Sequence, residues 1–339
     1  DNSNSVLSQG LRKHFSDDLL FTNFQSVCNG TIATIERLTV MSPVPRLFMS
    51  KYRYKKLPTS ITIPFNKSGY DCSFITGMDI AWENINVALA HQGFTDIVGK
   101  YKLLSYNPSY DNNTIGVYDH YLFDYLINRI NVKKPHPQMT MVLTTTNHPP
   151  FTLPDNVNLP KVGNSFYENN CFNLLGKDVL EKYIRTFQYF NKCLSDFLDE
   201  FKKSPAAENT ILIVTGDHNV RSILNYNNVS SKWKYSVPLY IYMPPYLRSG
   251  KYPMKSERYG SHYDILPTIA PFAFKNVEYV NMGYNLLDDS VDVTQTYSYN
   301  EELVLSMPSN NNYAKRIADA KNVLLRLYFQ SVMSEMNNK

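Results

Sequence analysis

The strongest chemical signal in the sequence is a carboxylate beside an imidazole, Asp217 and His218, in the tetrapeptide Thr215 to His218 that directly follows the apolar run Ile211 to Val214. Ligands of an open parallel sheet bind beyond the carboxyl ends of its strands, so we expect both side chains to project into such a crevice. A carboxylate oxygen and an imidazole nitrogen suit a divalent ion of the zinc or manganese type. A turn aspartate followed by a surface histidine is an equally simple interpretation of these residues alone.

A second signal is a threonine at the predicted start of a helix. Thr31 follows Gly30 and precedes the apolar-periodic segment Ile32 to Thr39. Unpaired N–H groups and the helix dipole at this position favour an alkoxide or an incoming phosphoryl group. A hydroxyl is a poor nucleophile at neutral pH, and metal coordination is one of the few ways to activate it. The pattern predicts Thr31 as a nucleophile activated by an ion at Asp217, with Thr34 as the rival nucleophile and a plain N-cap role as the simpler alternative.

Four further positions are candidates for substrate contacts. His148 follows the apolar segment Met139 to Thr145 and precedes two prolines, which stiffen its exit from the strand, so it could bind a phosphoryl oxygen or act as a general acid. His262 could bind substrate or a second metal, whereas Asp264 is expected to cap the helix that follows. Asp79 and Trp82 offer a carboxylate and an aromatic wall for a polyol. For each of them a purely structural role is an open alternative.

Short apolar segments alternate with helical patterns along the chain. Strands are expected at Ser60 to Ile63, Cys72 to Thr76, Met139 to Thr145, Thr210 to Thr215 and Pro238 to Met243. Helices are expected near Ile32 to Thr39, Glu83 to His91, Lys177 to Lys203 and Ala314 to Met336. This alternation predicts an α/β fold with a mostly parallel central sheet and helices on both faces. A small C-terminal subdomain is expected to follow it.

Composition narrows the function classes. The chain has 339 residues and a formal net charge of +4, and its one dense basic run, Lys51 to Lys56, is too short for a nucleic-acid footprint. We therefore expect no nucleic-acid partner. The four cysteines are widely separated and form no CxxC pair, so they predict neither a zinc site nor a disulfide scaffold. The sequence has no apolar run of about 18 residues, so no membrane span is predicted.

Taken in order, these motifs resemble the lipoteichoic acid synthase and phosphoglycerol transferase branch of the alkaline phosphatase and sulfatase superfamily. The resemblance covers residues 19–287, and the segments that carry it are Leu20 to Phe24, Asn29 to Thr31 with Glu36 and Pro43 to Pro45, Asn147 to Phe151, Gly216 to His218, and Ser261 to Thr268. It implies residues 1–290 as a sulfatase-like catalytic domain and 291–339 as a C-terminal subdomain or helix.

The resemblance also implies roles for single residues. Thr31, Asp217 and His218 would hold one divalent metal, Mn or Zn with Mg as a further possibility, and Thr31 would accept the phosphoryl group. His148 would contact the phosphate. The remaining polar groups around the substrate would be Asp79, Trp82, Arg221 and His262; Arg221 is equally interpretable as a surface charge.

Two departures from the family pattern stand out. The family has a fourth metal ligand, a glutamate at the end of the first strand of the sheet, and no residue here can be assigned to it; the chain is expected to start just after that glutamate and so to lack the first strand. A basic residue close after the tryptophan in glycerol phosphate transferases is matched here by Glu83 and Asn84. A fragment with three of four ligands is expected to bind metal more weakly and could be inactive.

The function implied is transfer of a phosphoglycerol-like group from a lipid donor to a cell-envelope acceptor through a phospho-threonine. The substrate would be an anionic lipid or glycan bearing phosphate, and the domain would face outward from a bacterial membrane, anchored by an N-terminal region absent here. The alternatives are a phosphoethanolamine transferase, a sulfatase-type hydrolase, which would need a C/S-x-P-x-R motif that the chain lacks, or a non-catalytic envelope-binding relative.

Overall fold

The computed structural model describes most of the chain. Its described residues are 2–155, 157–168, 172, 176–221, 223–228, 230–248, 255–300, 303–306 and 311–338.

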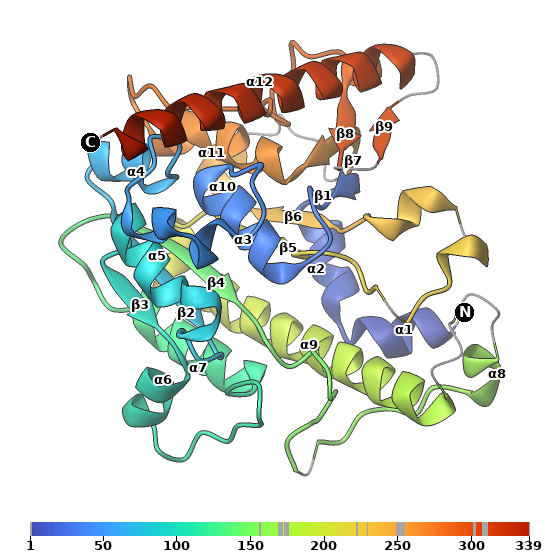
Figure 1. Cartoon of the computed structure of the whole chain (residues 1–339). Helices are drawn as coiled ribbons and strands as arrows, with labels where there is room; N and C mark the ends of the chain where they lie inside the picture. Colours follow the sequence, from blue (N-terminus) through green and yellow to red (C-terminus); the bar gives the residue numbers. More distant parts are fainter. Residues whose placement is uncertain are drawn as a thin grey trace.

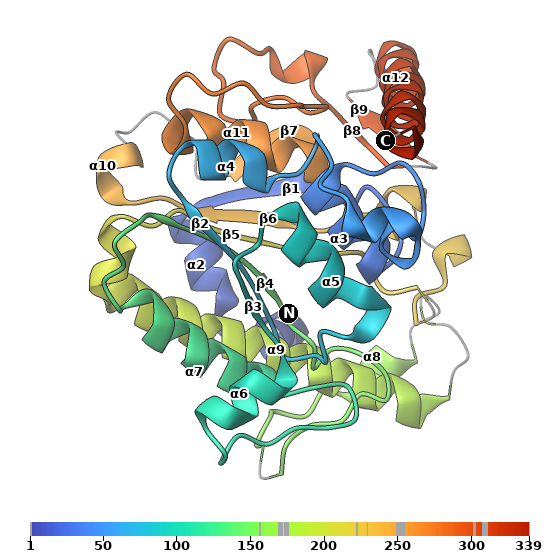
Figure 2. The ribbon, with the colours of Figure 1, turned by 60° about the vertical axis from the view of Figure 1, so that its left-hand side comes forward.

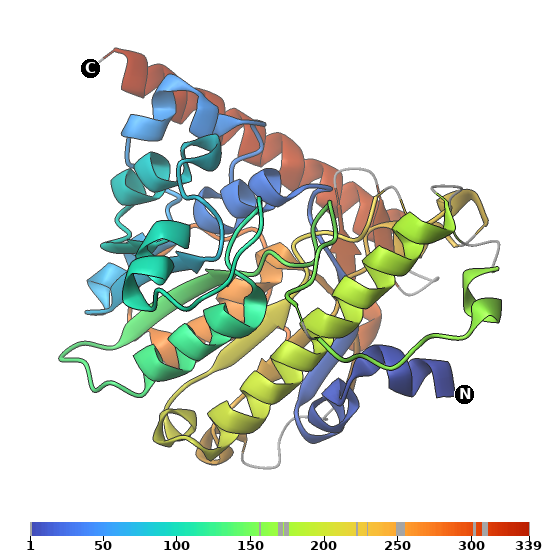
Figure 3. The same cartoon turned by 90° about the horizontal axis from the view of Figure 1, so that it is seen from below.

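Seven strands of the described chain build the centre of the molecule in two hydrogen-bonded sheets, with orders β5-β6-β1-β7 and β3-β2-β4. Their bounds are β1 Leu19–Gln25, β2 Asp71–Thr76, β3 Asp96–Val98, β4 Gln138–Leu143, β5 Leu212–Thr215, β6 Leu239–Tyr242 and β7 Lys255–Ser261. The two sheets lie side by side in one layer (Figures 1 and 3). All pairs are parallel except those of β6, which runs antiparallel to both β1 and β5.

Helices cover both faces of this layer (Figures 1 and 2). The α-helices are α1 Asn2–Ser8, α2 Leu11–Asp17, α3 Thr31–Val40, α4 Thr62–Lys67, α5 Ile85–Gln92, α6 Lys100–Tyr106, α7 Asp119–Ile130, α8 Asn164–Tyr167, α9 Lys177–Lys203, α10 Pro245–Arg248, α11 Ile265–Ala273 and α12 Asn311–Asn337. Single 3-10 turns include η1 Leu47–Met49, η2 Lys51–Tyr54, η3 Trp82–Asn84 and η4 Pro205–Glu208.

Side chains alternate between two cores, one on each face of the sheet. On β2, Phe74 packs into the core formed with α3, α5 and α12, whereas Ile75 packs into the core formed with α7 and α9. On β6, Ile241 and Tyr242 divide in the same way between the two faces. Because both faces of the sheet are covered, almost all side chains of β2 and β6 are removed from water. Figure 3 shows α7 and α9 crossing one of these faces.

Most elements expected from the sequence are confirmed. The α/β class is present, and α9 spans the residues expected for it. Helix α5 ends at Gly93, whose φ of 100° lies in the left-handed region that terminates helices. The strand expected at Ser60 to Ile63 is wrong: turns there lead into α4, and Thr62 Oγ1 hydrogen bonds to the backbone of Gln92 instead of leaving its segment free to join a sheet. Strands β1, β3 and β7 were not expected.

The C-terminal segment packs into the core of the main domain. It contains the hairpin of β8 Tyr297–Tyr299 and β9 Val304–Ser306, followed by α12. Ala318, Leu325 and Phe329 of α12 are buried in the same core as α3 and β2. The segment after residue 290 is therefore an extension of one core and has no separate one among the described residues. No helix in the described ranges is both long and apolar enough to cross a membrane.

Candidate metal and phosphoryl-transfer site

Two strand ends bring the threonine and the metal-type side chains together. β1 ends at Gln25, and the chain then turns through Gly30 into α3, with Thr31 as the first helical residue. β5 ends at Thr215 and leads directly to Asp217 and His218. β1 and β5 run in the same direction because both pair with β6 antiparallel, so their carboxyl ends lie at one edge of the sheet.

Three side-chain atoms of the kinds that bind metal ions converge at this edge. Thr31 Oγ1 donates a hydrogen bond to Asp217 Oδ2 at 2.6 Å and lies 3.4 Å from His218 Nε2. His218 Nε2 lies 3.6 Å from Asp217 Oδ2. Thr31 is not the N-cap, a position that Gly30 occupies. The hydroxyl therefore faces the Asp217 loop and does not cap its own helix.

Two of the three separations are those of ligands around one ion. Bonds of about 2.1 Å in tetrahedral geometry place neighbouring ligand atoms about 3.4 Å apart, close to the 3.4 Å and 3.6 Å that join His218 Nε2 to Thr31 and Asp217. The third separation, 2.6 Å between Thr31 and Asp217, is a hydrogen bond, which an ion of the zinc or manganese type would replace. Within the described ranges no three His, Cys, Asp or Glu side chains form a metal-type group, so the hydroxyl of Thr31 is needed to complete the set of three.

The orientation of His218 is set by its other ring nitrogen. Nδ1 donates to the carbonyl of Asn219 at 2.7 Å, which leaves the lone pair of Nε2 directed at Thr31 and Asp217. The backbone N–H of His218 donates to Asp217 Oδ1 at 2.9 Å, so Oδ2 is the carboxylate oxygen that faces the threonine. Both side chains are therefore held with Oδ2 of Asp217 and Nε2 of His218 facing Thr31.

Two buried side chains hold the backbone beneath these ligands. Thr34 Oγ1 donates to the carbonyl of Asp217 at 2.8 Å, and His262 Nε2 donates to the carbonyl of Gly216 at 2.9 Å. Gly216 itself allows a close approach, because a Cβ there would lie 2.9 Å from Cγ1 of Val237. Thr34 and His262 therefore fix two successive carbonyls of the loop that carries Asp217 and His218.

These contacts change two interpretations made from the sequence. Thr34 is fully buried and its hydroxyl is engaged, so it is not placed as a nucleophile. His262 is only 2% exposed and lies under the loop, where it cannot meet a substrate at the surface. Burial lowers the pKa of His262 to about 4, which keeps the ring neutral and its Nε2 proton available to Gly216. Asp264 is the acidic member of a capping box with Ser261 at the start of the 3-10 turn His262–Asp264. It occupies the N-cap position of α11, as expected, but its side chain makes no cap hydrogen bond to that helix.

Arg221 lies beside the start of α3. A methyl group on Gly30 would lie 3.5 Å from Nη1 of Arg221. The guanidinium therefore adjoins the residue before Thr31, where the first N–H groups of the helix also point. A planar cation next to helix N–H groups is a binding arrangement for phosphoryl oxygens.

The loop that carries His148 is anchored from two helices. The carboxylate of Asp119, at the start of α7, accepts hydrogen bonds from the backbone N–H groups of Thr145 at 2.8 Å and Thr146 at 3.2 Å. Thr186 of α9 donates to Asn147 Oδ1 at 3.1 Å. Asp119 was not singled out in the sequence; a helix-start aspartate after the loop Asn112 to Val117 was the available signal.

His148 is exposed at the end of this anchored loop. Its Nδ1 donates to the carbonyl of Pro149 at 2.7 Å, so Nε2 is the nitrogen left to exchange a proton. No contact joins its ring to Thr31, Asp217 or His218 within the described part of the chain. The expected phosphate contact of His148 stays a prediction.

Asp79 and Trp82 lie in the loop after β2, at the same edge of the sheet as Thr31. Asp79 Oδ1 accepts a hydrogen bond from the N–H of Ala81 at 2.9 Å, and the Trp82 side chain is 38% exposed. Glu83 has φ 50° and forms an ion pair with Arg46 at 3.6 Å. The structure leaves Trp82 open to solvent, but it does not bring Asp79 or Trp82 into contact with the three donors.

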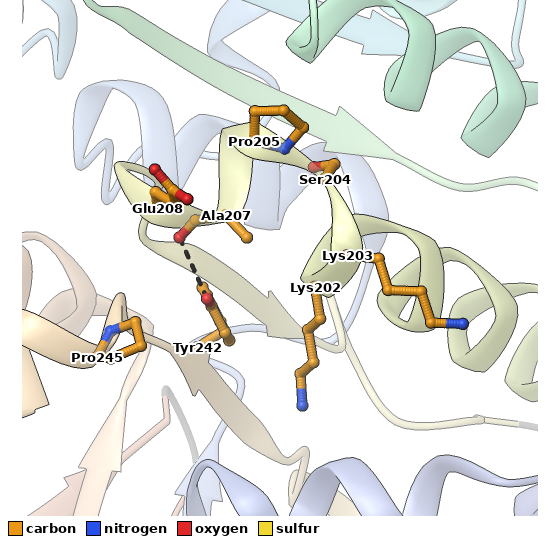
Figure 4. Close-up of a pocket in the computed structure, with 8 residues that line it drawn as sticks. All are labelled: Lys202, Lys203, Ser204, Pro205, Ala207, Glu208, Tyr242 and Pro245. Atoms are coloured by element: carbon orange, nitrogen blue, oxygen red, sulfur yellow. Dashed lines mark hydrogen bonds between the residues drawn. The ribbon is translucent and has the colours of Figure 1, made fainter.

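A pocket of about 280 Å³ lies at the opposite end of β5 (Figure 4). It is lined by Lys202, Lys203, Ser204, Pro205, Ala207, Glu208, Tyr242 and Pro245. The hydroxyl of Tyr242 donates to the carbonyl of Ala207 at 3.1 Å across it. Because η4 precedes β5 and Asp217 follows it, this pocket is separated from the Thr31 site by the length of the strand.

A family model described as Sulfatase matches residues 12–273, more than three quarters of the chain. The chain belongs to the sulfatase family. It is 24% identical over 262 residues to lipoteichoic acid synthase 1 of Bacillus subtilis, an alignment that covers 72% of this chain and 37% of that protein. The chain therefore spans well under half the length of this curated relative.

Solved structures of two bacterial proteins have a similar fold. The lipoteichoic acid synthase LtaP from Listeria monocytogenes matches with a TM-score of 0.73 at 15% identity, over 96% of this chain and 86% of that one. The C-terminal periplasmic domain of EcEptC from Escherichia coli, solved in complex with Zn, matches with a TM-score of 0.56 at 13% identity, over 89% and 85% of the two chains. At these identities the likeness establishes a shared fold.

Proposed function

We propose that this sulfatase-family chain is the catalytic domain of a phosphotransferase that moves a phosphoglycerol-like group from a lipid donor to a cell-envelope acceptor. The observation that carries the proposal is the hydroxyl of Thr31 at a helix N-terminus, 2.6 Å from Asp217 Oδ2 and 3.4 Å from His218 Nε2. A role in folding alone would not require a hydroxyl, a carboxylate and an imidazole to converge at the substrate edge of the sheet. The similarity to a lipoteichoic acid synthase supports the same reaction class.

Thr31, Asp217 and His218 would hold one divalent ion, Zn or Mn. Such an ion would lower the pKa of the threonine hydroxyl and neutralise part of the negative charge on the phosphoryl group. The zinc complex of the E. coli periplasmic domain supports this choice of ion. Arg221 and the first N–H groups of α3 orient the anionic phosphodiester toward Thr31.

The reaction proceeds in two displacements. Thr31 Oγ1 attacks the phosphorus of the donor, a new O–P bond forms, and the P–O bond to the lipid alcohol breaks. The threonine proton leaves along its hydrogen bond to Asp217 and passes to solvent, while His148 Nε2 protonates the departing alkoxide. An acceptor hydroxyl then attacks phospho-Thr31 and gives its proton to His148, and Thr31 regains a proton as its bond to phosphorus breaks.

The location follows from the proposed substrates. A lipid donor and an envelope acceptor meet at the outer face of a bacterial membrane, so we place this domain there. The matched E. coli structure is a periplasmic domain, which supports that placement. The anionic partner in this scheme is a phosphate-bearing lipid or glycan.

The test is capture of the covalent intermediate. The protein, with Zn or Mn, is incubated with phosphatidylglycerol vesicles, and the peptide containing Thr31 is examined by mass spectrometry for one glycerophosphoryl group, with diacylglycerol release measured in parallel. Thr31→Ala should abolish both signals. Thr22→Ala, which removes an exposed threonine of β1, is the matched control and should retain them.

Metal binding is measured separately by calorimetry with Zn and with Mn. The chain should bind the ion, and Asp217→Ala should abolish binding. If the chain binds neither ion, or if the adduct forms on a residue other than Thr31, the phosphotransferase proposal is wrong. A non-catalytic envelope-binding role would then be the better account.

A further inference from the structure

Positive charge is concentrated in one stretch of the chain. Residues 37–70 contain seven lysines and arginines and no aspartate or glutamate. The whole chain has a net charge of only +4, so the residues outside this stretch carry a net charge of −3. Such an asymmetry indicates a surface for an anionic partner, distinct from a general solubilising charge.

The fold gathers five of these cations around two 3-10 turns that contact each other, η1 and η2. We name this area the basic surface; it consists of Arg46, Lys51, Arg53, Lys55 and Lys56 together with Met49 and Tyr54. Arg53 is held in place, since its Nη2 donates to the hydroxyl of Tyr54 at 2.9 Å and its Nη1 to the carbonyl of Ser50 at 3.1 Å. Lys51, Lys55 and Lys56 are exposed, and none of the three pairs with a described carboxylate.

Apolar side chains are exposed within the same surface. Met49 is 44% exposed and Tyr54 is 51% exposed. Asn84 Nδ2 contacts the sulfur of Met49 at 2.9 Å, so the surface continues to η3, where Trp82 is 38% exposed. Long cationic side chains mixed with a tyrosine, a methionine and a tryptophan are the composition of surfaces that lie at a lipid–water interface.

The basic surface adjoins the edge of the sheet that carries the nucleophile. η1 and η2 follow α3, the helix that begins with Thr31, and η3 lies in the loop at the carboxyl end of β2. Figure 2 shows the η1–η2 segment, in blue, beside α3 and α5. A bilayer in contact with this surface would therefore lie on the side of the sheet that α3 and α5 cover, and not behind α9 on the far face.

We propose that the basic surface docks this domain directly on an anionic lipid bilayer. Complementary charge supplies long-range attraction, and Met49 and Tyr54 enter the head-group region. A nucleic acid fits less well, because the basic run is short and the exposed apolar side chains would have no counterpart on a phosphate backbone. Docking itself is independent of catalysis; the benefit of presenting a donor lipid to Thr31 rests on the proposed function.

The test is co-sedimentation of the full chain with vesicles of phosphatidylcholine and of an equal mixture of phosphatidylcholine and phosphatidylglycerol. Binding should require the anionic lipid and should weaken as salt increases. Each basic residue near an anionic surface contributes about a fivefold factor in partitioning, so Lys51→Glu/Lys55→Glu/Lys56→Glu should bind at least about 100-fold less. The matched control, Lys133→Glu/Lys134→Glu/Lys161→Glu, changes the same charge on exposed lysines elsewhere and should lose much less.

A second variant tests the apolar part of the proposal. Met49→Ser/Tyr54→Ser leaves the charge unchanged and should weaken binding to the mixed vesicles, most clearly at high salt. Equal losses of binding in the two triple variants would show that only net charge matters. If short duplex DNA displaces the protein and the Met49→Ser/Tyr54→Ser change has no effect, the surface is a general polyanion site. Either result overturns docking. Zinc binding is measured on every variant and should stay unchanged, so failure of the surface and failure of the catalytic site are read separately.

Discussion

Replacing Thr34 with valine tests whether its hydroxyl positions the loop that carries Asp217 and His218, apart from its effect on the stability of α3. Thr34 is fully buried, and its hydroxyl donates to the carbonyl of Asp217 at 2.8 Å. Valine has nearly the same shape, so the main change is an unpartnered buried carbonyl, which costs about 1–3 kcal/mol in the free energy of unfolding. Because that carbonyl belongs to a proposed metal ligand, the affinity for Zn or Mn should also fall about 10- to 100-fold, or about 1.4–2.7 kcal/mol.

The control for this experiment is Thr39→Val in the same helix. Thr39 is also buried, but its hydroxyl donates to the carbonyl of Ile35 within α3 at 2.6 Å and does not reach the Asp217 loop. Urea unfolding of both metal-free variants measures stability, and calorimetry measures ion affinity. Thr34→Val should lower both quantities and Thr39→Val only stability. If the two variants bind the ion equally well, Thr34 does not position the loop and the reasoning is refuted.

Three further changes test the surroundings of the site. Burial lowers the pKa of His262 to about 4, so its contribution to the free energy of unfolding is complete above pH 6.5. About 3 kcal/mol of that contribution is lost as the pH falls from 6.5 toward 4. His262→Gln should reduce this loss, measured by urea unfolding at a series of pH values. Burial raises the pKa of Asp119 to about 6, although its backbone hydrogen bonds act in the opposite direction. The folded chain therefore keeps this proton at low pH, and the free energy of unfolding falls by about 3 kcal/mol as the pH rises from 4 through 6. Asp119→Asn should remove this dependence on pH, and an unchanged dependence would contradict the assignment. Gly216→Ala should destabilise the chain by about 1–3 kcal/mol through its contact with Val237, and Val237→Ala added to it should restore most of the loss in thermal unfolding.

Helices were easier to predict from the sequence than strands. The 27-residue helix α9 is long and strongly amphipathic, so its periodicity alone defines it. Strands β1 and β7 were missed because they carry polar residues such as Asn23 and Glu257, and their place in the sheet depends on partners more than 200 residues away. Ser60 to Ile63 shows the opposite error: an apolar run was assigned to a strand although local side-chain hydrogen bonds favour turns and a helix.

The site divides in the same manner between local and long-range information. The types of Thr31, Asp217 and His218 and their positions after strands were evident in the sequence, because hydroxyl, carboxylate and imidazole chemistry depends on residue type alone. Their convergence within 2.6–3.6 Å depends on β6 placing the ends of β1 and β5 at one edge. The role of His262 could not be predicted, since only packing determines whether a histidine faces substrate or lies beneath a loop.

The sequence by itself determined the α/β class, the long helices and the candidate nucleophile and ligands, because hydrophobic period and residue chemistry are local properties. Only the tertiary structure decided that Thr34 is engaged below the loop, that Arg221 lies beside Gly30, and that Met49 of the basic surface contacts Asn84 of η3. These facts depend on contacts between segments distant along the chain. Such contacts are set by the sum of burial and hydrogen bonding over the whole core, which no single motif contains.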